Sequence, residues 1–337
     1  MPSVKYLFGS TSWVRIVMRI LFCSEGFPTA ADRLSTILPN DQVLRCSIDD
    51  VPIHLDRADV LVPAMARIGS EILKLGSFGL IQQWGVGLER VDVEAATKEG
   101  VWVARVPSRG TGNAESVAEH AVLMMLNLSR HISQARQSFE AQRWGQPEGQ
   151  ALFGKTAVIV GLGDVGTALA VRLRALGMRL LAIRGRPEVC APAELGICEV
   201  RGRFDLHQLL SEADFVIVCA KYDASTHHLI DEAAIAAMKR GVFFINVARG
   251  GLVDHEALLR ALEGGRIAGA GLDVFWNEPV DPNHPLFRQN VLATPHIAGV
   301  TDVSYNGIAG AVAENIRRYA QRERPLHAVN DPPNPRW

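Results

Sequence analysis

The chain has 337 residues, of which 48% are hydrophobic and 21% charged, so it is long enough to form about two globular domains with sizeable cores. Lysine and arginine total 35 against 36 aspartate and glutamate, and a net charge of −1 gives no general attraction to nucleic acid or to an anionic membrane. No apolar run reaches the roughly 18 residues that a membrane span requires. We therefore expect a cytoplasmic protein without nucleic-acid or membrane partners.

Five cysteines occur at positions 23, 46, 190, 198 and 219, without a CxxC pair or a Cys/His cluster. An odd number of dispersed cysteines favours buried free thiols in a reducing compartment over a disulfide framework. The same spacing predicts no metal site. Residues 1–17 mix polar and charged residues without the apolar centre of a signal peptide, so we expect a loose N-terminal extension there.

Short apolar runs alternate with helix-like stretches in the first hundred residues. Strands are expected at 18–23, 43–46, 60–62, 80–84 and 101–103, with helices near 31–37 and 68–75. Buried strands that alternate with helices predict a parallel sheet covered by helices on both faces.

A long amphipathic helix is expected to begin at Asn113 and to end before Trp144. Asn113 can cap its first turn, and Glu115 suits the positive end of the helix dipole. The apolar stripe of this helix predicts packing in the core and between subunits.

The second half of the chain repeats the alternation of strand and helix. Strands are expected at 156–160, 180–183, 215–219, 242–247, 270–274 and 291–293, and a last helix at 303–319. This pattern predicts a second doubly wound sheet.

The apolar run 158–160 stops at the sequence Gly161-Leu162-Gly163-Asp164-Val165-Gly166, which continues directly into a helical stretch. Glycines with the spacing G-x-G-x-x-G let the backbone approach a pyrophosphate, and the helix N-terminus faces its negative charge. Because this turn lies between a strand and a helix, the six residues predict a dinucleotide site.

The type of dinucleotide depends on the end of the next strand. NAD sites usually have an acidic residue there, which accepts hydrogen bonds from the ribose, whereas this chain has Arg184-Gly185-Arg186. A guanidinium can clamp a 2′-phosphate, so Arg184 and Arg186 favour NADP(H) over NAD(H). If the two arginines only form a solvated loop, NAD remains the alternative.

Three charged or titratable residues follow the last three predicted strands: Arg249, Glu278 and His296. We expect all three strands to be buried. Ligands bind beyond the carboxyl ends of parallel strands, so these side chains are expected to converge near the nicotinamide. Taken singly, each has a plain structural explanation, such as a surface ion pair or a hydrogen-bonded core histidine.

The order of these motifs resembles the D-isomer-specific 2-hydroxyacid dehydrogenase family, which includes glyoxylate/hydroxypyruvate reductases and D-lactate, D-glycerate and D-3-phosphoglycerate dehydrogenases. The resemblance extends from residue 18 to about 329. It is carried by Gly85-Val86-Gly87, by 113–119, by Gly154-Lys155-Thr156, by the glycine turn, and by 246–250, 271–275 and 295–298.

The resemblance implies an α/β fold of two doubly wound parallel-sheet domains, with a Rossmann NAD(P)-binding domain inserted into a flavodoxin-like substrate domain. We expect the substrate domain at 1–112 and 300–337 and the NAD(P)-binding domain at 113–299, with the catalytic cleft between the two domains. We also expect a homodimer.

The resemblance further implies that Arg249 binds the substrate carboxylate and carbonyl, that His296 donates and accepts the proton, and that Glu278 hydrogen-bonds His296. The ordinary histidine pKa of about 6.5 suits proton transfer in both directions. Other residues are assigned less specifically: Ala248 and Asp273 to the cofactor, with Asp273 at the nicotinamide amide, and Ala64, Met65, Val86 and Gly87 to the substrate.

The sequence thus predicts an NAD(P)-dependent oxidoreductase that reduces a small 2-keto acid of the glyoxylate or hydroxypyruvate type with NADPH. One alternative is a D-3-phosphoglycerate dehydrogenase, which we rank lower because many of these carry a regulatory domain beyond the point where this chain ends. The other is a dinucleotide-sensing protein of the co-repressor type, which has the same fold and triad.

Overall fold

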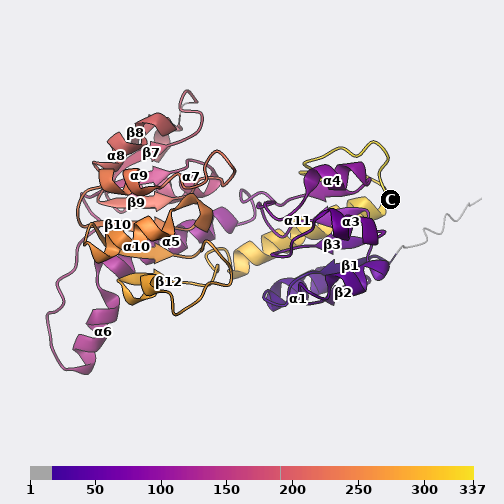
Figure 1. Cartoon of the computed structure of the whole chain (residues 1–337), viewed down its shortest axis with the longest axis horizontal. Coiled ribbons are helices and arrows are strands. Elements are labelled where there is room, and N and C mark those ends of the chain that lie inside the picture. Colours follow the sequence, from indigo (N-terminus) through magenta and orange to yellow (C-terminus); the bar gives the residue numbers. More distant parts are fainter. Residues whose placement is uncertain (1–16, 190) are drawn as a thin grey trace, which may run out of the picture. The chain divides into compact units, whose positions relative to one another are not determined.

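Residues 17–189 and 191–337 are described by the computed structural model, in which the chain divides into two compact units. Unit 1 combines Met1–Pro107 with Ile308–Trp337, and unit 2 is Ser108–Gly307 (Figure 1). Each unit contains one fully parallel sheet, as predicted. Apart from Val17, the expected N-terminal extension lies outside the described residues.

The sheet of unit 1 has the strand order β2-β1-β3-β4-β5, which is the order of flavodoxin-like folds. Its strands are β1 (Arg19–Phe22), β2 (Gln42–Arg45), β3 (Val60–Val62), β4 (Leu80–Gln82) and β5 (Trp102–Ala104), and its helices are α1 (Pro28–Ile37), α2 (Val51–His54), α3 (Ser70–Leu75) and α4 (Val93–Lys98). The last helix, α11 (Asp302–Ala320), begins in unit 2 and continues into unit 1.

The sheet of unit 2 has the order β12-β11-β10-β9-β6-β7-β8, the doubly wound order of a Rossmann fold extended by one strand. Its strands are β6 (Thr156–Val160), β7 (Arg179–Ile183), β8 (Ile197–Arg201), β9 (Phe215–Val218), β10 (Val242–Asn246), β11 (Ile267–Leu272) and β12 (Val291–Ala293).

Two edge strands depart from the expectations. The sequence did not predict β8, because this strand is only half-buried and its residues are not a continuous apolar run. The expectation of a buried strand before His296 was wrong, since β12 is half-exposed at the opposite edge of the sheet.

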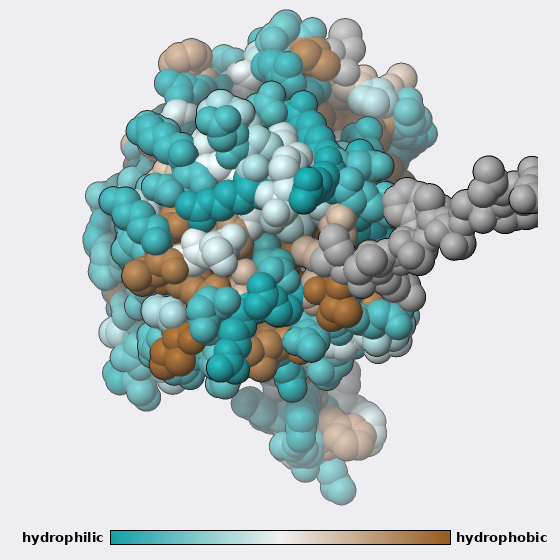
Figure 2. Space-filling view, turned by 90° about the vertical axis from the view of Figure 1, so that its right-hand side faces the viewer, coloured by the Kyte–Doolittle hydropathy of each residue, from teal (hydrophilic) through white to brown (hydrophobic). Residues whose placement is uncertain are grey.

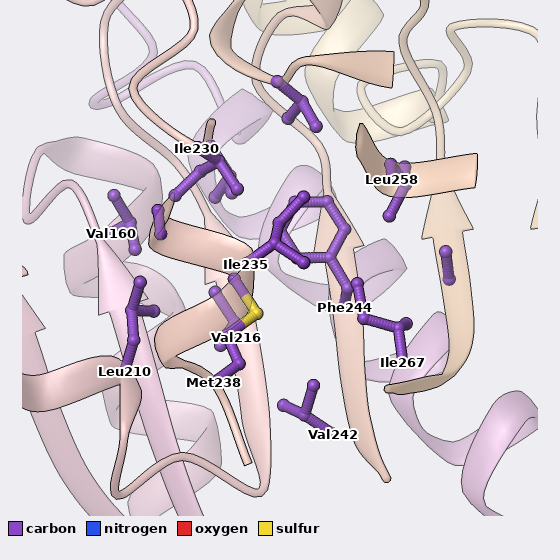
Figure 3. Close-up of a cluster of buried hydrophobic side chains, with 14 of the residues drawn as sticks. Val160, Leu210, Val216, Ile230, Ile235, Met238, Val242, Phe244, Leu258 and Ile267 are labelled. Atoms are coloured by element: carbon purple, nitrogen blue, oxygen red, sulfur yellow. The ribbon is translucent and has the colours of Figure 1, made fainter. Parts of the chain in front are cut away.

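Alternate side chains of the central strands enter two hydrophobic cores on opposite faces of the sheet. Helices α5 (Asn113–Ser129) and α7 (Asp164–Ala175) pack on one face, whereas α8 (Leu206–Leu210), α9 (Glu232–Ala237) and α10 (His255–Glu263) pack on the other. Figure 3 shows the second core, in which Phe244 of β10 faces Ile235 and Met238. These cores fix the strand ends that carry the candidate site.

The helix expected from 113 to before 144 is two helices, α5 and α6 (Ile132–Glu140). His131 has a left-handed backbone with φ of 52°, which breaks the run. Asn113 does not cap α5, because the N-cap is Gly112 with φ of 76°. The Asn113 side chain instead donates to Ser108 Oγ at 3.0 Å and accepts from Ser304 Oγ at 3.1 Å.

No helix among the described residues is long and apolar enough to cross a membrane. The face in Figure 2 is mostly hydrophilic, with hydrophobic residues in separate patches. Of the four described cysteines, Cys23 and Cys46 are buried, Cys219 is partly buried and Cys198 is exposed, so the expectation of buried thiols was wrong for Cys198.

Candidate functional site

The glycine turn follows the fully buried strand β6 and has backbone positions that exclude larger residues. Gly161 has φ of 106°, and a Cβ there would lie 2.5 Å from the Ala220 backbone. A Cβ at Gly166 would lie 2.1 Å from the Gly161 carbonyl oxygen. At Gly163, by contrast, a Cβ would meet no atom within 4 Å. The first and third glycines therefore serve packing, while the second leaves open space beside the turn.

Helix α7 begins at Asp164, and its N-cap Gly163 provides no side-chain hydrogen bond. The first N–H groups of the helix thus face the open space beside Gly163 without a capping side chain, and the helix dipole adds positive potential there. The Asp164 carboxylate is paired with Arg109 Nε at 3.1 Å, which offsets its charge. These residues fit the pyrophosphate of a dinucleotide.

Arg184 lies at the same edge of the sheet as the glycine turn. The Gly161 N–H donates to the Ile183 carbonyl at 2.8 Å, so the ends of β6 and β7 are directly joined. The half-buried Arg184 guanidinium donates through Nη1 to the Val189 carbonyl at 2.9 Å, and Arg186 is exposed. Because a guanidinium has five N–H donors, this one bond leaves others for a phosphate.

Glu278 and His296 form a hydrogen-bonded pair, with Nδ1 of the imidazole 2.9 Å from Oε2 of the carboxylate. The other oxygen, Oε1, accepts from the Phe275 N–H at 3.0 Å. Burial alone would raise the pKa of Glu278, but the hydrogen bond and charge of His296, the Phe275 N–H and the charge of Arg249 together hold this pKa below its usual value. The carboxylate is therefore ionised at neutral pH and fixes one imidazole nitrogen as a donor.

The backbone that carries His296 is held by Asp273, whose side chain is 1% exposed. The His296 N–H donates to the Asp273 carbonyl at 2.9 Å. The Asp273 carboxylate accepts from Thr294 Oγ1 at 2.6 Å and from the N–H groups of Ile297 and Ala298 at 2.8 and 2.9 Å. Asp273, expected at the cofactor amide, is thus occupied by three donors of the segment that follows β12.

The half-buried Arg249 lies in a turn organised by Asn246, the buried last residue of β10. Asn246 Oδ1 accepts from the Ala248 N–H at 3.0 Å, and its Nδ2 donates to the Arg249 carbonyl at 2.9 Å. Arg249 Nη1 donates to the Ala248 carbonyl at 2.7 Å. The motif 246–250 contributes to the family resemblance, but the sequence did not predict that Asn246 positions Arg249.

Gly250 joins this turn to the segment that carries Glu278. A Cβ at Gly250 would lie 1.9 Å from the Phe275 carbonyl carbon, so the two backbones are in direct contact. Strands β10, β11 and β12 are neighbours in the sheet. Arg249, Glu278 and His296 therefore follow adjacent strands at one edge of unit 2, and the charge of Arg249 acts on Glu278.

In unit 1, two loops that contain the predicted substrate residues are connected by Gln83. Its Nε2 donates to the Ala64 carbonyl at 3.2 Å and to the Gly87 carbonyl at 2.6 Å. Ala64 has a left-handed φ of 51°, while Met65 is half-buried and Val86 is 37% exposed. The structure thus brings Ala64 and Gly87 together, and it identifies Gln83 as a residue that the sequence analysis did not predict.

A potential metal-binding group occurs in unit 2, although no metal site was expected. Within the described ranges, His255, Glu256 and His284 have ligand atoms that all lie within 4.8 Å of one another. No spacing rule indicated this group, because His284 is far from the other two residues in the chain.

Comparisons with known proteins identify the family of this chain. Residues 122–298 match the family model for the D-isomer specific 2-hydroxyacid dehydrogenase, NAD binding domain. The chain is 34% identical over 307 residues to the D-3-phosphoglycerate dehydrogenase of Bacillus subtilis (strain 168). This alignment covers 89% of the chain and 57% of that protein. The chain spans about half the length of the curated relatives it matches.

Solved structures resemble nearly the whole chain. The TT0316 protein of Thermus thermophilus superimposes with a TM-score of 0.79 at 30% identity, covering 93% of this chain and 100% of that one. The D-lactate dehydrogenase of Aquifex aeolicus, in complex with NAD and lactic acid, superimposes with a TM-score of 0.78 at 27% identity and covers 93% and 99% of the two chains.

Proposed function

We propose, from the premise that the chain belongs to the D-isomer-specific 2-hydroxyacid dehydrogenase family, that it is an NAD(P)-dependent reductase of small 2-keto acids. The observation that carries this proposal is the hydrogen bond between His296 and Glu278 in the same unit as the glycine turn. A partly exposed imidazole held by a half-buried carboxylate can exchange a proton with a bound keto acid, a step that dinucleotide binding alone does not require.

The bound nicotinamide would supply the hydride that reduces C2 of the keto acid. In this proposal, the Glu278 carboxylate accepts from His296 Nδ1, so the other ring nitrogen is available to give a proton to the carbonyl oxygen. The Arg249 guanidinium binds the substrate carboxylate and polarises its carbonyl. In the reverse direction, the same nitrogen of His296 accepts the hydroxyl proton.

We further propose that NADP(H) is the preferred cofactor. The support is the position of Arg184 directly after β7, whose end is joined to the glycine turn, with Arg186 exposed two residues later. Neither residue can accept a hydrogen bond from a ribose hydroxyl, whereas both can pair with a phosphate. The dehydrogenase of Aquifex aeolicus in complex with NAD makes NAD(H) the competing assignment.

The proposed substrate class is glyoxylate, hydroxypyruvate and similar short keto acids. Its support is the uncharged character of the four residues assigned to the substrate in unit 1, Ala64, Met65, Val86 and Gly87. A phosphorylated substituent would require a cation there, and Arg90, which donates through Nη1 to the Met65 carbonyl at 3.0 Å, could supply it. The second candidate substrate is 3-phosphohydroxypyruvate, because the curated relative from Bacillus subtilis is a D-3-phosphoglycerate dehydrogenase.

We also propose a homodimer that forms through α5 and α6. Figure 1 shows α6 and the loop that follows it projecting from the rest of unit 2. Large apolar side chains on this part of the chain are exposed, namely Leu123 at 54%, Ile132 at 49%, Phe139 at 69% and Trp144 at 78%. An exposed apolar surface of this kind marks an interface. Light scattering should give twice the chain mass, and Leu123→Glu with Phe139→Glu should give the monomer.

The decisive experiment measures oxidation of NADPH and NADH with glyoxylate, hydroxypyruvate, pyruvate and 3-phosphohydroxypyruvate. We expect turnover with the first two substrates and a preference for NADPH. Tight dinucleotide binding without turnover of any acid would reject the enzyme and favour a dinucleotide sensor. Preferred turnover of the phosphorylated acid would replace the first substrate assignment by the second.

A further inference from the structure

A group of three metal-ligating side chains lies in unit 2, apart from the residues assigned to hydride transfer. His255 and Glu256 are the first two residues of α10, and His284 precedes the 3₁₀ helix η5 (Pro285–Arg288). In the described part of the chain, this is the one group of three or more His, Cys, Asp or Glu residues close enough to share an ion. Its ligand atoms lie within 4.8 Å of one another.

The spacing of the first two ligands already suits a metal ion. His255 Nε2 lies 3.4 Å from Glu256 Oε1. Two ligands on one tetrahedral zinc ion, with bonds of about 2.0–2.1 Å, are roughly 3.3 Å apart. The side chains of His255 and Glu256 are 28% and 56% exposed, so an ion can reach them from solvent.

The two imidazoles are held in place by an aromatic stack. The His255 ring lies parallel to Trp276, with centroids 4.1 Å apart and an angle of 10° between the planes. The Trp276 and His284 rings are 4.9 Å apart, and Phe287 stacks on Trp276 at 6.5 Å. Ordered ligands lose little conformational freedom when an ion binds, which favours affinity.

The two rings are also placed by backbone and ring contacts. His284 Nδ1 accepts from the Leu286 N–H at 3.3 Å, and the His255 and His284 rings have centroids 6.0 Å apart.

We propose that His255, Glu256 and His284 bind one divalent transition-metal ion of the Zn²⁺ type, with water completing its coordination. Two imidazoles and one carboxylate match the preferences of Zn²⁺, Co²⁺ and Ni²⁺, whereas Mg²⁺ and Ca²⁺ prefer oxygen ligands alone. The ion lies against Trp276, two residues before Glu278, and so stiffens the segment that leads to this carboxylate. It takes no part in the proposed hydride transfer.

Isothermal titration of the tag-free chain with Zn²⁺ tests the proposal. The protein should carry Cys198→Ser, because an exposed thiol would compete for the ion. We expect one ion per chain, and binding at least about tenfold weaker in His255→Phe, His284→Asn and Glu256→Gln. His255→Phe keeps an aromatic ring on Trp276, and His284→Asn keeps an acceptor for the Leu286 N–H. Both variants should therefore unfold near the temperature of the metal-free parent.

The matched control is His207→Gln, which removes an exposed histidine on α8 and should leave binding unchanged. As an independent readout, Ni²⁺ should quench fluorescence of the parent, and Trp276→Phe should lose most of that quenching. No bound ion, Zn²⁺ binding unaffected by both histidine variants, or equal binding of Mg²⁺ would each overturn the proposal. Because none of these readouts uses turnover, they are independent of the proposed enzyme activity.

Discussion

His296 Nδ1 lies 2.9 Å from Glu278 Oε2, and the other oxygen of this carboxylate, Oε1, accepts a hydrogen bond from the Phe275 N–H. The imidazole is thus oriented by a group whose pKa lies below its usual value, because the bonds and charges around it outweigh its burial. The pair therefore presents the other imidazole nitrogen as a proton donor in a fixed orientation. Substitutions of His296 and of Glu278 distinguish the proton donor from the residue that orients it.

His296→Asn should lower kcat for keto-acid reduction by about 10²- to 10⁴-fold, the usual contribution of a general acid. The affinity for NADPH should change less than about twofold, because the glycine turn follows β6, on another part of the sheet. Glu278→Gln should give a smaller loss, since the amide oxygen still accepts from the ring. Steady-state kinetics and fluorescence titration of the cofactor measure both effects. Unchanged turnover of His296→Asn would exclude its acid function.

Arg184→Asp should reverse the cofactor preference. A carboxylate at this position repels the 2′-phosphate of NADPH and can accept from the ribose hydroxyls of NADH. We expect the ratio of kcat/KM for NADPH over NADH to fall by about 10- to 100-fold, in line with the loss of a charge-assisted hydrogen bond of roughly 1.5–3 kcal/mol. Arg184→Lys, which keeps the charge but loses the bidentate geometry, is the control. A ratio that stays constant in Arg184→Asp would argue for NAD(H).

Gln83→Met should raise the KM for the keto acid while affecting cofactor affinity little. The amide of Gln83 donates to the carbonyls of both Ala64 and Gly87, and methionine, of similar size, cannot replace either bond. Loss of about 1.4 kcal/mol of substrate binding corresponds to a tenfold higher KM. Gln83→Glu is the companion variant, since it lacks the amide donor but is still polar. An equal fall in kcat for every cofactor and acid would instead indicate general misfolding.

The buried Tyr319 makes the stability of unit 1 fall at alkaline pH. Burial is the main cause that raises the pKa of Tyr319 to about 12, with Asp59 acting in the same direction. A raised pKa stabilises the fold fully below the unfolded value of about 10, and this stability is lost as the pH rises from there towards 12. The Tyr319 hydroxyl also donates to the Arg336 carbonyl at 3.2 Å.

Tyr319→Phe tests this dependence, because phenylalanine keeps the ring and does not titrate. At pH 8 the variant should be less stable by about 1 kcal/mol, the value of one hydrogen bond. Relative to the parent, the variant should gain up to about 1.4 kcal/mol for each pH unit between 10 and 12, so that it becomes the more stable of the two before pH 12. Urea unfolding monitored by circular dichroism at several pH values measures the difference. A disadvantage that does not change with pH would contradict the raised pKa.

The residue pattern predicted most of the fold because buried parallel strands are short apolar runs and the glycine turn has a distinctive spacing. Strand β8 was missed for the converse reason, since an edge strand in partial contact with solvent lacks that pattern. The break at His131 was also missed, because a left-handed histidine has no sequence signature. A helix or strand is therefore predicted well only when the pattern of apolar residues in its own sequence reflects its burial.

The candidate triad could be predicted from its position after strands, and the structure places the three residues after neighbouring strands. The residues that position this triad could not be predicted in the same way. Asn246 and Asp273 act through backbone N–H and carbonyl groups whose partners are defined only by the folded chain. The same limit applies to His255 and His284, which are brought together by the packing of a helix against a distant loop.

The contact between Gly250 and the Phe275 backbone has a consequence for how such a site changes during evolution. The turn that carries Arg249 and the segment that carries Glu278 touch where no side chain intervenes. A larger residue at Gly250 would therefore displace the substrate-binding arginine and the carboxylate partner of His296 together. Substitutions in loops such as 63–65 of unit 1 can therefore change the substrate range. Substitutions at the contact between Gly250 and Phe275 would instead disturb Arg249 and Glu278 at the same time.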